Sequence, residues 1–138
     1  RDRSGAFPLA IPHRLVSMFS VQGDTVLDPF LGTGTTTLAA MAAGRDSVGV
    51  ERDESLLAAL DDRVDAIGDR SRRIARDRLD AHREWVTERR GEGKEPGYEA
   101  KHYDFAVNTK QERRIRLYAA GDVERTDEGY RVTHTPVE

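Results

Sequence analysis

The sequence has no cysteine and no apolar run that approaches the roughly 20 residues of a membrane-spanning helix. The first absence excludes disulfides and thiolate metal sites. A hydrophobic content of 37% still allows a modest core, and 138 residues suit one domain. We therefore expect a soluble, cytoplasmic protein. Its net charge of −3 provides no overall attraction to nucleic acid.

A stretch rich in small residues organises the first half of the chain. Thr25–Leu27 is a short apolar run typical of a buried strand, and a glycine loop follows it. Strong helix formers then occupy 38–43 and end at Gly44, a residue that favours the end of a helix. A second strand is predicted over 47–51. Strand, glycine loop, helix and strand form a βαβ unit, which brings backbone N–H groups to a ligand.

The ligand of this loop is indicated by the residues around it. A phosphate-binding P-loop would have lysine where Thr35 stands, and a dinucleotide site would have a third glycine in place of Thr37. Asp28 ends the first strand, where a carboxylate repels a pyrophosphate and suits a cation or an amine. S-adenosylmethionine carries both a sulfonium and an ammonium group. Glu51, at the tip of the second strand, lies where the ribose of a nucleotide-like cofactor would bind.

The string from Asp28 to Thr36 closely resembles the cofactor motif of the DNA amino-methyltransferases, which methylate adenine N6 or cytosine N4. Ala6–Pro12 is similar to a second cofactor segment of that family. The resemblance covers roughly residues 5 to 66. It implies an α/β fold, with a partial class I methyltransferase-like (Rossmann-like) sheet and flanking helices. It also implies S-adenosylmethionine as cofactor and DNA as partner of the complete enzyme.

Together the pattern and the resemblance predict a cofactor site without a metal. Its residues are Phe7, Pro8, Asp28, Pro29, Phe30, Gly32, Gly34, Thr35, Glu51 and Asp53.

Most of these residues also have a purely structural explanation. The glycine loop could be only a tight turn, Glu51 a solvated strand end, and Asp28 a cap on the loop. Phe7 and Pro8 could belong to the core, whereas the resemblance implies that they approach the methionine portion of the cofactor. Asp53 could cap a helix or contact the adenosine.

The catalytic half of the chemistry is absent from these 138 residues. An exocyclic amine is a poor nucleophile because its lone pair is delocalised, so the base must be flipped out and held in line with the methyl group. The family does this with Asp, Asn or Ser followed by Pro-Pro and an aromatic residue, and no such tetrapeptide occurs here. We name no catalytic residue. We expect a longer or two-chain enzyme in which a partner chain or an N-terminal segment carries the tetrapeptide.

Two other functions stay open at this point. The chain could be a catalytically inactive remnant or regulatory module that binds S-adenosylmethionine, or a class I methyltransferase that does not act on DNA. The segment around Phe7 and Pro8 argues against the second, because it belongs to the DNA family. Adenine and cytosine are both open as targets.

The remaining pattern divides the chain into three parts. Residues 1–68 form the cofactor-binding region, and residues 69–97 form a charged helix and a glycine-rich linker. Residues 98–138 form a small β-rich segment. The basic side chains of the charged helix could meet DNA phosphates, but the acids among them favour a solvated face. They are Arg70, Arg72, Arg73, Arg76 and Arg78.

Element boundaries are predicted within each part. After an extended Phe7–Pro12, a helix runs to about Ser20. An amphipathic helix after Glu51 is interrupted at Gly68. Candidate strands in the last part cover 103–107, 115–119 and 129–133, with a turn at 127–129.

Overall fold

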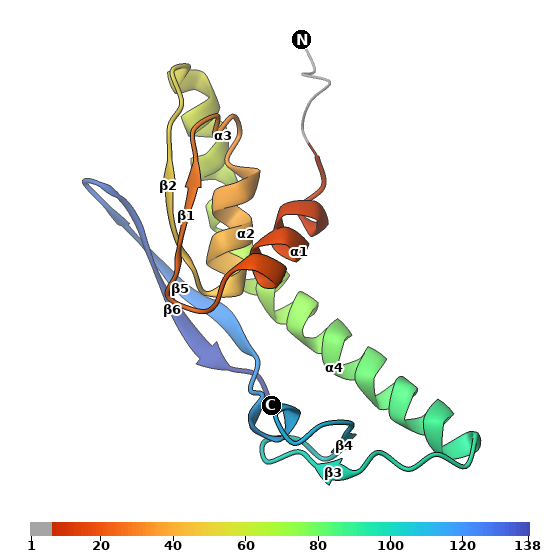
Figure 1. Ribbon diagram of the computed structural model, residues 1–138. Coiled ribbons are helices and arrows are strands. Elements are labelled where there is room, and N and C mark those ends of the chain that lie inside the picture. The colour runs from red at the N-terminus through yellow and green to blue at the C-terminus, as the bar shows by residue number, and fades with distance from the viewer. Residues whose placement is uncertain (1–6) are drawn as a thin grey trace.

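A computed structural model describes residues 7–138 and has a mixed α/β architecture (Figure 1). A long helix, α4 (Ile67–Gly91), runs from the middle of the molecule to its far end, and a β-hairpin packs against the first part of this helix. The elements in chain order are α1 (Ala10–Phe19), β1 (Thr25–Asp28), α2 (Thr35–Ala43), β2 (Asp46–Gly49), α3 (Glu54–Val64), α4 (Ile67–Gly91), β3 (Tyr98–Glu99), β4 (Ala106–Val107), the 3₁₀ turn η1 (Glu112–Arg114), β5 (Tyr118–Thr126) and β6 (Gly129–Pro136).

The first sheet is the predicted βαβ unit. Strands β1 and β2 are parallel, with Thr25 opposite Asp46 and Asp28 opposite Gly49, and α2 makes the crossover between them. Helix α2 ends at Gly44, which adopts the left-handed conformation with φ 70° and donates its N–H to Met41. The α/β class is therefore confirmed, with a partial parallel sheet flanked by helices.

Helix α2 forms the centre of the main core. Its residues from Leu38 to Ala42 are buried on every side, as its continuous apolar sequence requires. Leu60 and Val64 of α3 and Ile67 of α4 pack against this helix region. The core thus supports the glycine loop from beneath, because α2 begins where that loop ends.

The break between α3 and α4 lies at Asp65 and Ala66, so the predicted interruption at Gly68 is wrong. Gly68 is helical and serves packing: a Cβ there would lie 3.3 Å from the carbonyl oxygen of Gly121 in β5. One turn later the buried Ser71 hydroxyl donates to the Ala42 carbonyl and accepts the Ala120 N–H, each at 3.0 Å. These contacts join α4, α2 and β5.

Other predicted boundaries shift by a few residues. Helix α1 starts at Ala10, two residues before Pro12, so the extended segment is shorter than predicted. Strand β2 ends at Gly49, which leaves Glu51 in the connection to α3. The segment 115–117 is not a strand, and β5 begins at Tyr118.

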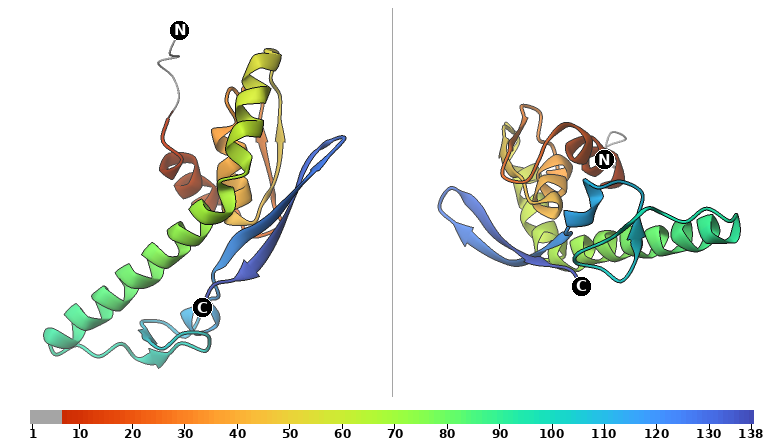
Figure 2. Two further views of the ribbon diagram at one scale, coloured as in Figure 1. Left: turned by 180° about the vertical axis from the view of Figure 1, so that it is seen from behind. Right: turned by 60° about the horizontal axis from the view of Figure 1, so that its bottom comes forward.

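The C-terminal segment forms two small antiparallel sheets. Strands β3 and β4 pair near the far end of α4, and β5 pairs with β6 around the predicted turn at Asp127. Both views in Figure 2 show this hairpin standing beside α4 and the first sheet. None of the helices formed by residues 7–138 is both long and apolar enough to cross a membrane.

Candidate cofactor site

The loop between β1 and α2 closes over the carboxyl end of the parallel sheet. The Val50 N–H donates to the Asp28 carbonyl at 2.9 Å, and the Leu31 N–H donates to the Val50 carbonyl at 3.0 Å. The Leu31 side chain is buried over Gly49, where an added Cβ would lie 2.7 Å from a Leu31 methyl carbon. The loop is therefore fixed to β2 by backbone pairing and by close packing on a residue without a side chain.

The Glu51 carboxylate holds the loop and the connection to α3 together. Its Oε2 accepts the Gly32 N–H at 2.8 Å, and its Oε1 accepts the N–H groups of Arg52 at 2.8 Å and Asp53 at 2.9 Å. The Asp53 N–H, then those of Gly32 and Arg52, hold the pKa of Glu51 below its ordinary value of 4.5. Glu51 is therefore an ionised, oriented acceptor rather than a loose strand end.

These bonds limit what else Glu51 can accept. An ionised carboxylate offers about four acceptor positions, and three are used by backbone N–H groups. One position on Oε2 is left for a ligand hydroxyl. The second hydroxyl of a ribose could bind only if one of the backbone bonds were exchanged.

Both aspartates of the predicted site make local caps. Asp28 Oδ1 accepts the Phe30 N–H at 3.0 Å and so turns the chain out of β1. Asp53 is the N-cap of α3, and its Oδ1 accepts the Ser55 N–H at 3.1 Å and the Ser55 hydroxyl at 2.6 Å. The structural explanations given for these residues are thus correct, and contacts with a cofactor remain predictions for both.

The two loop glycines have different reasons to be glycine. Both have a positive φ, 57° at Gly32 and 77° at Gly34. A Cβ on Gly34 would lie 2.5 Å from a methyl carbon of the buried Leu60 in α3, whereas a Cβ on Gly32 would meet only the Phe30 carbonyl oxygen, at 3.9 Å. Gly34 is therefore needed for helix packing beneath the loop, and Gly32 borders open space.

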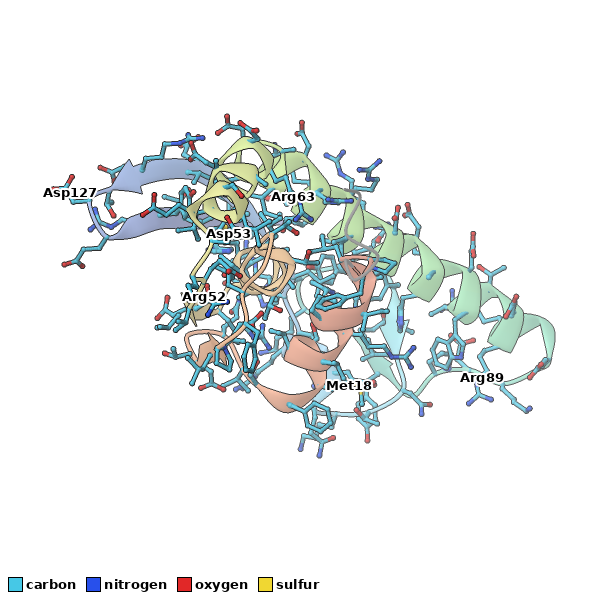
Figure 3. The ribbon with its side chains drawn as sticks, turned by 90° about the horizontal axis from the view of Figure 1, so that it is seen from above. Met18, Arg52, Asp53, Arg63, Arg89 and Asp127 are labelled. Atoms are coloured by element: carbon cyan, nitrogen blue, oxygen red, sulfur yellow. The ribbon has the colours of Figure 1, made fainter. Side chains whose placement is uncertain are left out.

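Arg63 is a site residue that the sequence pattern missed. From α3 its Nη1 donates to the Thr33 carbonyl at 2.7 Å and to the Thr33 hydroxyl at 3.1 Å, and the Thr35 hydroxyl lies 3.4 Å away. Burial lowers the pKa of Arg63, and the nearby Arg70 adds to the effect. Figure 3 shows Arg52, Asp53 and Arg63 together in the part of the molecule remote from Arg89.

Replacing Arg63 by methionine should lower the thermal stability of the chain and loosen its loop. The loss in unfolding free energy should be about 1 kcal/mol, because the broken bonds involve a charge but are partly solvated. Arg73→Met on the exposed face of α4 is the matched control. Equal melting temperatures for the two variants would show that Arg63 does not brace the loop.

The remaining predicted residues lie at the edges of this site. Phe30 is 88% exposed at the tip of the loop, next to the exposed Pro29. Phe7 and Pro8 precede α1 and are also exposed, so the suggestion that they belong to the core is wrong. Thr35 is buried in the first turn of α2. Contact of any of them with a cofactor stays a prediction.

A hollow beside the first sheet is separate from this site. It measures about 770 Å³ and lies between β2, α3 and the tip of the β5–β6 hairpin. Leu31 and Gly49 line it, but none of the ten predicted cofactor residues does. The predicted site therefore lies outside this hollow, at the end of the sheet. Within residues 7–138 no group of His, Cys, Asp and Glu side chains could hold a metal ion.

Known proteins match the part of the chain that builds this loop. The family model N6_N4_Mtase, described as DNA methylase, matches residues 4–61. This part of the chain belongs to the DNA amino-methyltransferase family. The type II methyltransferase M.MthZI of Methanothermobacter thermautotrophicus is 42% identical over 118 residues, which are 86% of this chain and 32% of that protein.

Further relatives match shorter segments of the chain. M.MjaI of Methanocaldococcus jannaschii is 51% identical over 75 residues, 54% of this chain and 24% of the relative. The solved structure of a putative DNA modification methylase from Thermus thermophilus, complexed with S-adenosyl-L-methionine, is 48% identical. Its match covers 44% of this chain and 26% of that one, with a TM-score of 0.43. The chain thus spans about a third of M.MthZI and a quarter of M.MjaI.

Proposed function

We propose that the chain is the S-adenosylmethionine-binding part of a DNA methyltransferase that acts on the exocyclic amine of adenine (N6) or cytosine (N4). The observation that carries the proposal is the Glu51 carboxylate, oriented by three backbone N–H groups at the end of a parallel sheet, in a chain of this family. S-adenosylmethionine would supply an electrophilic methyl group bonded to sulfonium sulfur.

The residues fit such a cofactor in charge and in hydrogen-bonding capacity. Glu51 has one acceptor position for a ribose hydroxyl, and the three backbone N–H groups that lower its pKa favour its ionised form. The carboxylate of Asp28 would favour a cationic group beside the loop. Within residues 7–138 the Phe30 N–H uses only its Oδ1, so Oδ2 could accept from a ligand. Asp53 would lie beside the adenosine.

A second polypeptide segment would complete the site. The face of the β1–β2 sheet away from α2 carries the register partners Leu27 and Val48, and Val50 follows directly after β2; all three side chains are more than half exposed. Helix α1 exposes Ile11, Leu15, Met18 and Phe19 to a similar extent. Exposed apolar surface of this kind marks an interface. We propose that the segment with the Pro-Pro tetrapeptide, on this or a partner chain, covers it and positions the target amine.

Isothermal titration tests the cofactor assignment through Glu51. The chain should bind S-adenosylmethionine, and Glu51→Ala should weaken the binding roughly tenfold to hundredfold, the range of a hydrogen bond to a charged group. Glu54→Ala, an exposed acid in the first turn of α3, is the matched control and should leave the affinity unchanged. A change of less than threefold for a folded Glu51→Ala variant would rule out the ribose contact.

A further inference from the structure

The segment 101–116 has a charge opposite to that of the chain as a whole. It contains five basic residues and only two acids, Asp104 and Glu112, in a chain whose net charge is −3. Asp104 Oδ1 lies 3.1 Å from an Arg83 nitrogen, and Glu112 Oε2 accepts the Thr109 N–H at 2.7 Å. Arg83 compensates the charge of Asp104, whereas the Thr109 N–H only orients Glu112, and the five basic residues still outnumber the two acids of the segment.

Four of these basic residues border one hollow beside η1. It measures about 320 Å³ and is lined by Lys101, Lys110, Gln111, Arg113 and Arg114. Two hydrogen bonds hold Arg113 against the segment 99–101. The Lys101 N–H donates to the Arg113 carbonyl at 2.8 Å, and Arg113 Nε donates to the Glu99 carbonyl at 3.3 Å. The hollow contains no carboxylate in its lining.

A second hollow adds positive charge where the end of the segment meets α1 and α4. It measures about 700 Å³, lies between α1 and α4, and includes Arg45, Arg78 and Arg116 in its lining together with His13. No Asp or Glu lines it. Burial, Arg45 and Arg78 all lower the pKa of His13, which agrees with a positive potential in this hollow. The right-hand view in Figure 2 shows segment 101–116 near the lower end of α1 and beside α4.

We propose that these two hollows form one basic surface that binds the phosphate backbone of DNA. The surface comprises Arg78, Lys101, Lys110, Arg113, Arg114 and Arg116. Guanidinium and ammonium groups that border hollows lined by no carboxylate attract phosphate oxygens, and guanidinium can bind them with two hydrogen bonds. The acidic remainder of the chain repels a polyanion, so the DNA is confined to this face. The inference rests on the proposed function, because it assigns DNA a place on the chain.

Neutralising three exposed members of the surface tests the proposal. The variant combines Lys101→Gln, Lys110→Gln and Arg114→Gln, and spares Arg113 because its Nε holds the backbone of Glu99. The control combines Arg70→Gln, Arg73→Gln and Arg76→Gln, three exposed arginines of α4 that line neither hollow. Both variants lose the same charge, so they differ only in where it is lost.

The measurement is fluorescence anisotropy of a labelled mixed-sequence duplex, titrated with each protein at several salt concentrations. The slope of log K against log salt concentration should become less negative by about 2–3 in the surface variant. The Kd of this variant at low salt should rise at least tenfold. The control should stay within about twofold of the wild type, since it leaves the phosphate contacts intact. Equal losses in both variants, or no loss in the surface variant, would overturn the proposal.

Two further arms separate this proposal from others. Oligoglutamate that displaces the duplex as effectively as an unlabelled oligonucleotide of equal charge would overturn it in favour of an acidic protein partner. Titration with S-adenosylmethionine should be unchanged in the surface variant. A chain that binds the cofactor but no DNA would contradict the basic surface alone, and a chain that binds DNA but no cofactor would contradict the proposed function alone.

Discussion

The purified 138-residue chain is expected to transfer methyl groups to DNA only at the background rate. The loop, Asp28 and Glu51 can hold a methyl donor, but no residue of the sequence matches the tetrapeptide that would orient the amine. Without that orientation the reaction loses a proximity effect on the order of 7–11 kcal/mol of barrier. The measurement is transfer of tritiated methyl groups from S-adenosylmethionine to mixed-sequence DNA.

Adding back the missing segment provides the matched comparison. A partner chain or N-terminal extension that carries the Pro-Pro tetrapeptide should cover the apolar sheet face around Leu27 and Val48 and restore transfer. A variant partner with the first tetrapeptide residue replaced by alanine should bind but not restore it. Robust turnover by the 138-residue chain alone would show that its catalytic residues lie among those assigned other roles.

Replacing Gly34 by valine should destabilise the chain and abolish cofactor binding. The left-handed backbone disfavours a side chain by about 1–2 kcal/mol, and crowding against a packed core adds about 1–3 kcal/mol. Together these costs should lower the free energy of unfolding by about 2–5 kcal/mol. Chemical denaturation measures the first effect, and titration with S-adenosylmethionine measures the second.

Gly23→Val separates the two contributions at Gly34. Gly23 also has a positive φ, 84°, but a Cβ there meets nothing within 4 Å. The Gly23→Val variant should therefore lose the stability that a side chain costs in the left-handed backbone, without the clash against Leu60. If Gly34→Val is no worse than Gly23→Val, the packing of the loop on α3 is not what requires glycine. A partial recovery in the double variant with Leu60→Ala would support the clash.

Local sequence signals predicted the parts of the fold that depend on neighbouring residues. The apolar run before Asp28, the helix formers before Gly44 and the turn at Asp127 each specify the backbone within a few positions. The predicted burial of the first strand is wrong, because Leu27 is 65% exposed. The order strand, loop, helix and strand then determined the parallel pairing of β1 and β2. Those features place the candidate site at the carboxyl end of the sheet.

Contacts between residues that are far apart in the sequence could not be predicted from the local sequence pattern. In the sequence Arg63 is one more charge on an amphipathic helix, and only the packing of α3 on α2 brings it to the Thr33 carbonyl. Gly68 has the low helix propensity of a glycine, which suggested a helix end. In the structure it lies inside α4, and its lack of a side chain lets β5 approach that helix closely. The alternating residues of 115–119 suggested a strand there, whereas pairing with β6 begins at Tyr118.

The central claim is that the glycine loop and Glu51 hold S-adenosylmethionine. Amide NMR of the isotopically labelled chain, titrated with this compound, tests the ligand and its location together. The account predicts saturable shifts in the amides that Glu51 binds, those of Gly32, Arg52 and Asp53, with smaller changes around Gly34. It is contradicted if a folded chain shows no shifts at millimolar ligand, or if the shifts gather around the hairpin hollow near Arg125 and Tyr130.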